Sequence, residues 1–376
     1  MIKNLFAICN CQQLLTHIFL FLHAMNKAQN LLRLNFSSFD KSWVLNYAYT
    51  QLRDGWALTL WKKEIFYFII DWLSESETIK VTTSGSTGTP KTLLLNKEYV
   101  KKSAEATNLF FNLKKGDKAL LCLPVKYIAG KLMIVRALEG NYNLFCVEPS
   151  LTPSFDETFI DFSAMTPAQV SSLLSKEQGR LLLDKLDKLI IGGDRISTLL
   201  DKKLQTINTK VWHTYGMTET ITHIALRKVN GSEASEWFSP MEHVSVLQQN
   251  QQLVINAPSI GVHQMVTNDV VEFNADGSFR VLGRTDNVVI SGGIKLFPEI
   301  IEKKLEEVCK NSFYFSGVND NTLGSKLVMY IESDNPIDVE DLKRTISMLL
   351  DKYEIPKDIV VKKHFKRTIS DKIIRE

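Results

Sequence analysis

The run of small residues from Thr82 to Thr89, followed by Pro90 and Lys91, has the composition of an anion-binding loop. Hydroxyl groups and glycine amides can surround a phosphate, and the ammonium group of Lys91 can add positive charge. The loop is not of the Walker type, because Lys91 follows a proline where that motif has a glycine. A flexible surface linker is the alternative, but linkers rarely carry Thr-Pro-Lys directly before an apolar strand. We expect phosphate contacts from Thr83, Ser84, Gly85, Ser86, Thr87, Gly88 and Lys91.

The segment from Thr83 to Lys91 resembles the phosphate loop of the adenylate-forming superfamily, which includes acyl-CoA synthetases, peptide-synthetase adenylation domains and luciferases. Further segments resemble other motifs of this family and follow in the family's order, so the resemblance covers about residues 80–376. It implies an α/β protein with a large N-terminal AMP-binding domain of mixed sheets and helices. It also implies a small, mobile α+β C-terminal domain.

Two of these segments are implied to bind the nucleotide. Ile191-Gly192-Gly193-Asp194 resembles the turn that lines the adenine, and its glycines let backbone approach a flat ring closely. Tyr215-Gly216-Met217-Thr218-Glu219-Thr220 resembles the motif whose Tyr stacks on adenine, whose Thr contacts phosphate and whose Glu holds magnesium. These residue types suit their implied roles, because an aromatic face fits a base and a carboxylate fits a hard cation.

The ribose contacts and the hinge are implied by two more segments. Asp269 follows Thr267-Asn268, where the family usually has Thr-Gly, and is implied to accept hydrogen bonds from ribose hydroxyls. Replacing this Gly by Asn is mild, because Asn tolerates a left-handed backbone best after Gly. Gly283-Arg284-Thr285-Asp286 matches the family's Gly-Arg-x-Asp. The match implies that Arg284 contacts the ribose or a phosphate and that Asp286 is the hinge.

Two segments near the C-terminus resemble the mobile parts of the family's site. Ser291-Gly292-Gly293-Ile294-Lys295 resembles the loop that enters for the thioester step, with Gly292, Gly293 and Lys295 as its residues. The closing segment 367–375 resembles the motif of the catalytic lysine, which is Lys372 here. Asp371 stands where the family prefers glycine and adds a negative charge beside the ammonium group. Glu302 matches the last Glu of the family's Pro-x-Glu-Ile-Glu.

The resemblance implies an ATP-dependent acid–CoA ligase. Joining a carboxylate to ATP brings two anions together, so positive charge and a metal ion are needed. Lys372 would bridge the carboxylate and the α-phosphate, and Glu219 would hold Mg²⁺. After rotation at Asp286, the thiol of CoA would attack the acyl-adenylate. The implied cofactors are ATP, Mg²⁺ and CoA.

The short length of the chain suggests which carboxylic acid is the substrate. Compact members of the family resemble bacterial o-succinylbenzoate–CoA ligases of menaquinone biosynthesis. The segment 123–130 lies where the family lines its acyl pocket, and Tyr127 replaces the usual His. A second carboxylate of the acid could meet Lys126, Lys131, Arg136 or His223, and His223 is favoured because it follows the 215–220 motif. The acyl-pocket candidates are Lys126, Tyr127, Gly130 and His223.

Two alternative functions stay open. One is an adenylating enzyme that loads the thiol of a carrier protein. The other is a non-catalytic nucleotide-binding remnant, to which Asp371 and Tyr127 give some weight. The presence of Lys372, Glu219 and Arg284 argues against the remnant.

Composition narrows the protein classes. The 376 residues include 45 Lys and Arg and 42 Asp and Glu, and a net charge of +3 is too small to imply nucleic-acid binding. A hydrophobic content of 44% can fill a sizeable core, which excludes disorder as the dominant state. Five cysteines are few and odd in number, so a reducing cytoplasm is expected. We expect small-molecule partners and no stable membrane insertion, and the oligomeric state stays open.

The first residues differ from the rest of the chain. Residues 1–24 contain one charged residue and a broken apolar run that is too short and polar to span a membrane. We expect them to be a non-native or disordered extension before Met25, with a weak membrane-facing segment as the alternative.

The remaining chain shows the pattern of two domains. Helical spacing dominates residues 25–80, after which short apolar runs alternate with helical stretches, as in an α/β sheet. After Gly283 the pattern of expected elements changes. We expect helices at 298–309 and 339–352 and strands at 326–332 and 358–362. We therefore expect an N-terminal domain over 25–283 and a C-terminal domain over 284–376.

Overall fold

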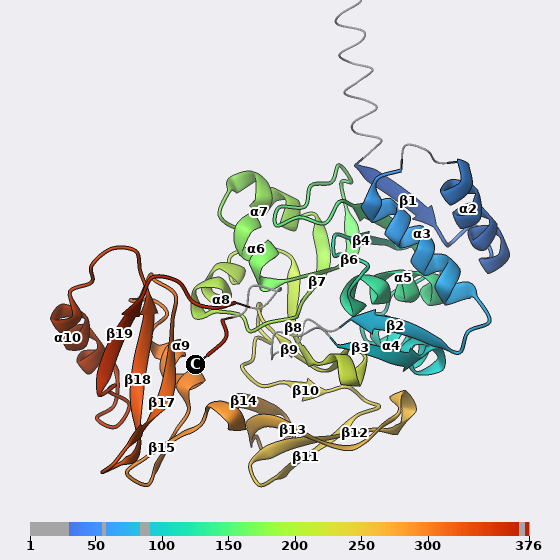
Figure 1. Cartoon of the computed structure of the whole chain (residues 1–376). Coiled ribbons are helices and arrows are strands. Elements are labelled where there is room, and N and C mark those ends of the chain that lie inside the picture. The colour runs from blue at the N-terminus through green and yellow to red at the C-terminus, as the bar shows by residue number, and fades with distance from the viewer. Residues whose placement is uncertain (1–29, 55–57, 83–90, 368–372, 376) are drawn as a thin grey trace, which may run out of the picture.

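A central eight-stranded sheet organises the N-terminal part of the computed structural model, which describes residues 30–54, 58–82, 91–367 and 373–375. The strand order is β1-β5-β4-β6-β7-β8-β9-β10, and neighbouring strands from β5 to β8 are parallel (Figure 1). The carboxyl ends of the parallel strands therefore meet at one edge. The strands are β1 (Leu31–Asn35), β4 (Lys118–Leu121), β5 (Asn143–Val147), β6 (Ile160–Met165), β7 (Leu186–Ile191), β8 (Lys210–Gly216), β9 (His223–Lys228) and β10 (Ser239–Pro240).

Helices cover both faces of this sheet, because its strands carry apolar side chains on both sides. Leu121 and Ile190 belong to one buried cluster, whereas their neighbours Leu120 and Leu189 belong to another. This two-sided burial is expected of parallel strands in an α/β fold. The first cluster includes residues of α2 (Lys41–Asp54), α3 (Leu60–Leu73), α4 (Lys97–Phe110) and α5 (Ile128–Gly140). The second includes residues of α6 (Pro167–Leu173), α7 (Glu177–Leu183) and α8 (Thr198–Leu204).

Smaller elements complete the N-terminal part. A four-stranded antiparallel sheet contains β11 (Ser245–Gln249), β12 (Gln252–Ala257), β13 (Val262–Phe273) and β14 (Phe279–Arg284). A hairpin joins β2 (Thr78–Thr82) to β3 (Thr92–Asn96). Three 3₁₀ turns are η1 (Thr218–Thr220), η2 (Pro258–Ile260) and η3 (Thr285–Asn287).

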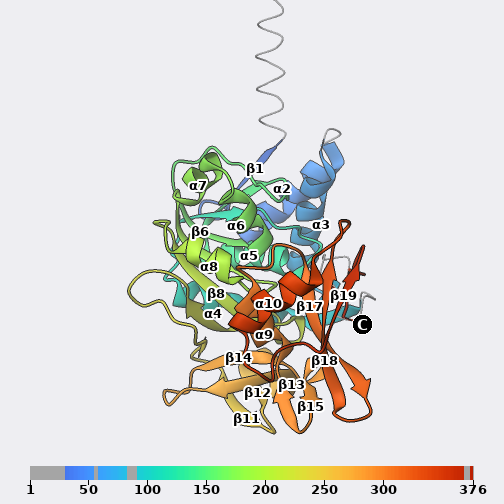
Figure 2. The same cartoon turned by 90° about the vertical axis from the view of Figure 1, so that its left-hand side faces the viewer.

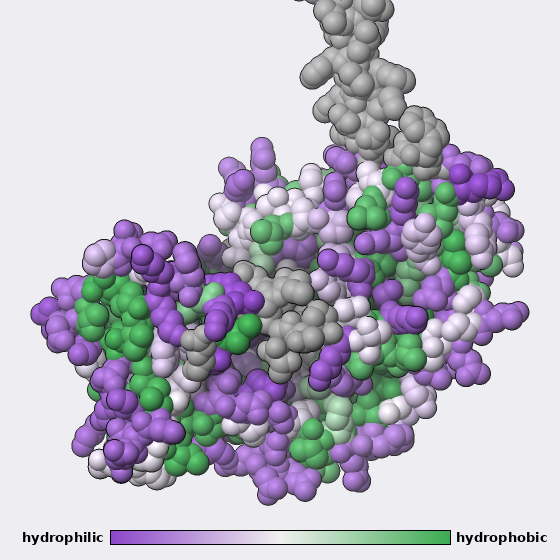
Figure 3. Space-filling view, viewed as in Figure 1, coloured by the Kyte–Doolittle hydropathy of each residue, from purple (hydrophilic) through white to green (hydrophobic). Residues whose placement is uncertain are grey.

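The C-terminal part forms a lobe with a core of its own (Figure 2). This third cluster contains residues from Val289 to Leu350, and η3 connects the lobe to β14. The strands are β15 (Val289–Ser291), β16 (Ile294–Leu296), β17 (Phe313–Asp320), β18 (Gly324–Glu332) and β19 (Asp358–Lys362). The helices are α9 (Pro298–Leu305) and α10 (Val339–Leu349). On the face drawn in Figure 3, hydrophobic residues gather on the surface of the C-terminal lobe.

The expected elements agree with the structure in kind but differ at two places. The stretch 25–80 contains strands β1 and β2 beside its helices, because β1 pairs with β5 across more than a hundred residues. Helix α9 ends at Leu305, four residues before Cys309. Across the described ranges, no helix combines the length and the apolar character needed to cross a membrane. The extension 1–24 lies outside the described residues.

Candidate active site

The carboxyl ends of β7 and β8 lie side by side and begin the candidate site. Open parallel sheets bind ligands at this edge. Gly192 follows β7, and a Cβ atom there would lie 2.4 Å from Thr214 Oγ1, so a larger residue would displace the turn. Gly193 has a φ of +89°, and Asp194 is exposed. The backbone at 192–194 is therefore open to a flat ligand at the edge of the sheet.

Three residues predicted to bind the nucleotide, from β8, β13 and β14, converge with the predicted hinge residue of η3. The Tyr215 hydroxyl donates a hydrogen bond to Asp269 Oδ2. Arg284 Nη1 lies 3.5 Å from Asp269 Oδ1, and Arg284 Nη2 lies 3.0 Å from Asp286 Oδ2. Burial and the Asp269 carboxylate raise the pKa of Tyr215, so its hydroxyl stays protonated and can donate. The rings of Tyr215 and Phe279 pack nearly perpendicular to each other, with ring centroids 5.2 Å apart.

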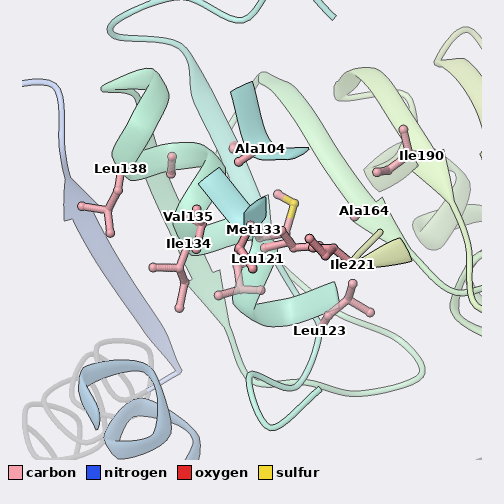
Figure 4. Packing of buried hydrophobic residues seen from close by; sticks show 14 of the residues in the cluster. Ala104, Leu121, Leu123, Met133, Ile134, Val135, Leu138, Ala164, Ile190 and Ile221 are labelled. Atoms are coloured by element: carbon pink, nitrogen blue, oxygen red, sulfur yellow. The ribbon is translucent and has the colours of Figure 1, made fainter. Parts of the chain in front are cut away.

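The turn after β8 is held from inside by Thr220. Its buried Oγ1 accepts a hydrogen bond from Met217 N at 3.0 Å and lies 2.7 Å from Thr222 O. Ile221 has a φ of +67° and belongs to the same buried cluster as Leu121 and Met133 (Figure 4). These anchors leave Glu219 exposed. The turn can therefore hold the exposed Glu219 carboxylate in a fixed position.

A buried guanidinium lies beneath this turn. Arg136, in the middle of α5, is 2% exposed, and its Nη2 donates to Thr222 Oγ1 at 3.1 Å. Its Nε has no hydrogen-bond partner, and no carboxylate of the described residues pairs with it. Burial lowers the pKa of Arg136 to about 10, so the side chain is still charged at pH 7. An orphaned buried cation of this kind is costly unless an anion joins it.

His223, which the sequence favours for a second carboxylate, is a neutral side chain here. Its Nε2 lies 3.3 Å from Thr107 Oγ1, and its Nδ1 lies 3.3 Å from Thr222 Oγ1. Burial and the positive charge of Arg136 hold its pKa well below its usual range. The positive charge behind the turn therefore belongs to Arg136.

The other acyl-pocket candidates lie at the start of α5. Tyr127 occupies the N-cap position of the helix without a side-chain capping hydrogen bond, and exposed Lys126 places its ammonium group 4.9 Å from the centre of the Tyr127 ring. A Cβ atom at Gly130 would lie 2.4 Å from Pro124 O, so glycine lets the helix approach the preceding loop. Lys131 stacks over Phe68, with its Nζ 4.3 Å from the ring centre.

The predicted phosphate loop starts and ends on the β2–β3 hairpin. Thr82 pairs with Thr92, so the described residues before and after this segment lie side by side. Lys91 is exposed at the start of β3. The predicted phosphate contacts Thr83, Ser84, Gly85, Ser86, Thr87 and Gly88 lie outside the described residues, as does Lys372.

The predicted thioester loop is the turn of the β15–β16 hairpin. Gly292 and Gly293 have φ values of +56° and +82°, which fit a tight two-residue turn. Lys295 reaches Gln251 at the β11–β12 turn. Asn268 lies in β13 and its φ is not positive, so this position does not use the left-handed backbone that Asn tolerates. Its side chain instead donates to Asp286 Oδ2 at 3.2 Å.

The sequence did not predict the contacts that Asp194 and Arg195 make. His213 Nε2 lies 3.1 Å from Asp194 O, and Arg195 Nη2 lies 2.9 Å from Glu306 Oε1 in the C-terminal lobe. The position of Arg195 directly after the 191–194 motif was a usable signal, but its partner is more than a hundred residues away.

The chain is similar to several known proteins. The AMP-binding enzyme family model matches residues 79–252. A 2-succinylbenzoate–CoA ligase of Listeria monocytogenes is 25% identical over 319 residues, which cover 78% of this chain and 68% of that protein.

Solved structures extend the likeness. The o-succinylbenzoate CoA synthetase of Bacillus subtilis, in complex with the acyl-adenylate intermediate OSB-AMP, has a TM-score of 0.65 and 20% identity, covering 79% of this chain and 67% of that one. An acyl-CoA synthetase (AMP-forming)/AMP-acid ligase II-like protein from Dyadobacter fermentans has a TM-score of 0.61 and 32% identity. That match covers 91% of this chain and 97% of the other. The chain therefore belongs to the adenylate-forming superfamily, the AMP-binding enzymes that include the acyl-CoA synthetases.

Proposed function

We propose that this protein is an AMP-forming acid–CoA ligase that adenylates o-succinylbenzoate and transfers the acyl group to CoA. The membership of the family supports the reaction class. Relatives named 2-succinylbenzoate–CoA ligase support the acid, at about 25% identity. The buried Arg136 is the observation on which the choice of acid rests.

The nucleotide would bind at the carboxyl edge of β7 and β8. Tyr215 would offer a ring face to the adenine, and the backbone at Gly192–Asp194 would lie along its edge. Asp269 and Arg284 would take the ribose and the neighbouring phosphate. The Asp269 carboxylate accepts a hydrogen bond from the Tyr215 hydroxyl and lies 3.5 Å from Arg284 Nη1. These two contacts hold it in position before a ligand binds. The phosphate loop on β2 and β3, with Lys91, would hold the outer phosphates.

Magnesium fits the residues at the turn after β8 as a companion of the nucleotide. Within the described ranges no three His, Cys, Asp or Glu side chains gather as a metal site, and Glu219 is a single exposed carboxylate. Mg²⁺ commonly binds one or two carboxylates together with substrate phosphates. Glu219 would hold the ion, which would neutralise charge on the phosphates, and the Thr218 hydroxyl would contact a phosphate.

The acid would lie against the turn 218–222, with one carboxylate toward the ATP and the other toward Arg136. Arg136 has a free Nε and a hydrogen bond to Thr222, the residue that joins the turn to β9. A guanidinium can bind a carboxylate through two parallel hydrogen bonds. A dicarboxylic acid would therefore supply the counter-ion that the described protein residues lack.

The chemistry would proceed in two steps around one hinge. Lys372 would approach the first carboxylate and the α-phosphate during adenylation. The C-terminal lobe, which we propose to begin at residue 284 and to rotate at Asp286, would then carry Gly292, Gly293 and Lys295 to the site. The separate core of the lobe and its connection through η3 support this division.

The test is product analysis by mass spectrometry. The purified protein is incubated with ATP, Mg²⁺, CoA and o-succinylbenzoate, with a control that omits CoA. We expect o-succinylbenzoyl-CoA with CoA and the acyl-adenylate without it. An acyl-adenylate that never transfers to CoA would indicate a carrier-protein acceptor. No product with this acid would refute the substrate, and no pyrophosphate release with any carboxylic acid would refute the enzyme.

A further inference from the structure

Glu302 is a buried acidic residue of α9, and its carboxylate accepts several hydrogen bonds. The residue is 2% exposed, and both of its oxygens are bound by Arg375: Oε1 lies 2.7 Å from Nη1 and Oε2 lies 2.8 Å from Nη2. Phe315 N also donates to Oε1 at 2.9 Å, and Phe315 O accepts from Arg375 Nη1 at 3.1 Å. Such a paired, two-point contact fixes both position and orientation of the guanidinium.

The same face of α9 contacts the N-terminal part. Arg195 Nη2 lies 2.9 Å from Glu306 Oε1 and 3.9 Å from Glu302 Oε2. Thr198 N, at the start of α8, donates to the other oxygen of Glu306 at 2.7 Å. Because Arg195 directly follows Asp194, this contact joins α9 to the proposed adenine turn. Figures 1 and 2 show α9 on the side of the lobe that faces α8.

Arg375 also belongs to the end of the chain that carries the proposed catalytic lysine. Lys372 precedes it by three residues in the sequence. The backbones of Arg367 and Ile373 form an antiparallel bridge, and Ile374 N donates to Lys366 O at 2.9 Å. The residues on either side of 368–372 are thus tied to each other, and Arg375 ties them to α9.

We propose that Glu302 is a positioning residue for the adenylation half-reaction: it holds the C-terminal end through Arg375 while α9 docks on Arg195 beside the nucleotide turn. This inference rests on the proposed function. It assigns to Glu302 and Arg375 a role in the first half-reaction only, because the proposed lysine acts there and the 291–295 loop acts in the second.

The experiment measures the two half-reactions separately in the full chain. Adenylation is followed by ATP–pyrophosphate exchange with o-succinylbenzoate, and transfer is followed by thioester formation from supplied acyl-adenylate and CoA. We expect Arg375→Ala to lower the exchange rate at least tenfold, with transfer within twofold of the unchanged protein. Arg375→Lys should restore part of the exchange, because it returns one positive charge without the two-point contact.

The matched control is Lys304→Ala on the same helix. Lys304 also pairs with two carboxylates, Asp351 at 2.9 Å and Glu354 at 2.6 Å, but it is exposed and does not contact Glu302 or Arg195. It should leave both half-reactions unchanged. Arg195→Ala, which removes a half-exposed side chain and leaves the Glu302–Arg375 pair in place, should lower exchange about threefold.

The outcomes separate this inference from the proposed function. Equal loss of both half-reactions in Arg375→Ala, or no loss in either, would overturn the positioning role. A loss of exchange in Arg375→Ala that Lys304→Ala reproduces would overturn it as well. If the unchanged protein shows no ATP–pyrophosphate exchange with any carboxylic acid, the proposed function fails, and the positioning role fails with it.

Discussion

Replacing Arg136 by methionine separates substrate binding from stability. Burial lowers the pKa of the Arg136 guanidinium from 12.5 to about 10. One pKa unit corresponds to about 1.4 kcal/mol, so keeping this side chain charged costs the fold roughly 3 kcal/mol. The hydrogen bond to Thr222 Oγ1 returns about 1 to 3 kcal/mol of that cost.

Methionine keeps the length and apolar body of the side chain without the charge. We therefore expect Arg136→Met to leave the free energy of unfolding unchanged or to raise it by about 1 to 2 kcal/mol. In a protein of this size the melting temperature would rise by up to several degrees. The same change removes the proposed carboxylate contact, worth about 3 kcal/mol, so kcat/KM for o-succinylbenzoate should fall roughly a hundredfold.

The assay compares two acids and a control variant. The second acid is 4-oxo-4-phenylbutanoate, which lacks the carboxylate on the ring, and its kcat/KM should change less than threefold in Arg136→Met. The control is Lys131→Met on the same helix, whose ammonium group stacks on Phe68 and not on the turn. Unfolding is followed by urea denaturation. A loss of more than about 2 kcal/mol of stability, or an equal loss of activity on both acids, would refute the reasoning.

Three further predictions follow from the geometry. Gly216→Ala should lower pyrophosphate exchange at least tenfold, because its Cβ would lie 2.3 Å from Thr222 O. Gly231→Ala has open space around its Cβ but strains the backbone at a φ of +83°, so it should lower stability and leave the exchange rate unchanged. Tyr215→Phe removes the hydroxyl that holds Asp269 but keeps the ring, so KM for ATP should rise severalfold, and Tyr215→Ala should raise it much further; equal values would exclude stacking. His213 is neutral because burial and Arg227 lower its pKa to about 3, and the pKa of His223 is also well below 6.5. The stabilisation from the two neutral histidines is complete above pH 6.5 and is lost as the pH falls, and for His213 the loss is about 2 kcal/mol at pH 5. Urea denaturation at pH 7 and pH 5 would show it, and His213→Gln should reduce the difference by about that amount.

Local patterns predicted the elements well where the signal is local. The strand at 358–362 has the expected bounds, and α10 begins at Val339, where the helix 339–352 was expected to begin. Strand β1 escaped prediction because its partner is β5, and its five residues carry no marker of a sheet edge by themselves. Asn268 replaces a glycine of the family motif without cost, because it lies inside β13 with an ordinary strand backbone.

The sequence by itself determined the order and chemistry of the motifs: small hydroxyl and glycine residues before Lys91, an aromatic and a carboxylate in 215–220, and an Arg-x-Asp at 284–286. These are properties of residue types and spacing, which a linear chain displays. Only the tertiary structure decided which charges meet. It buried Arg136 beneath the turn and made His223 neutral, because burial and a neighbouring cation set the protonation of a histidine. It also brought Glu302 to both Arg375 and Arg195, a contact between residues separated by 73 positions on one side and by more than a hundred on the other.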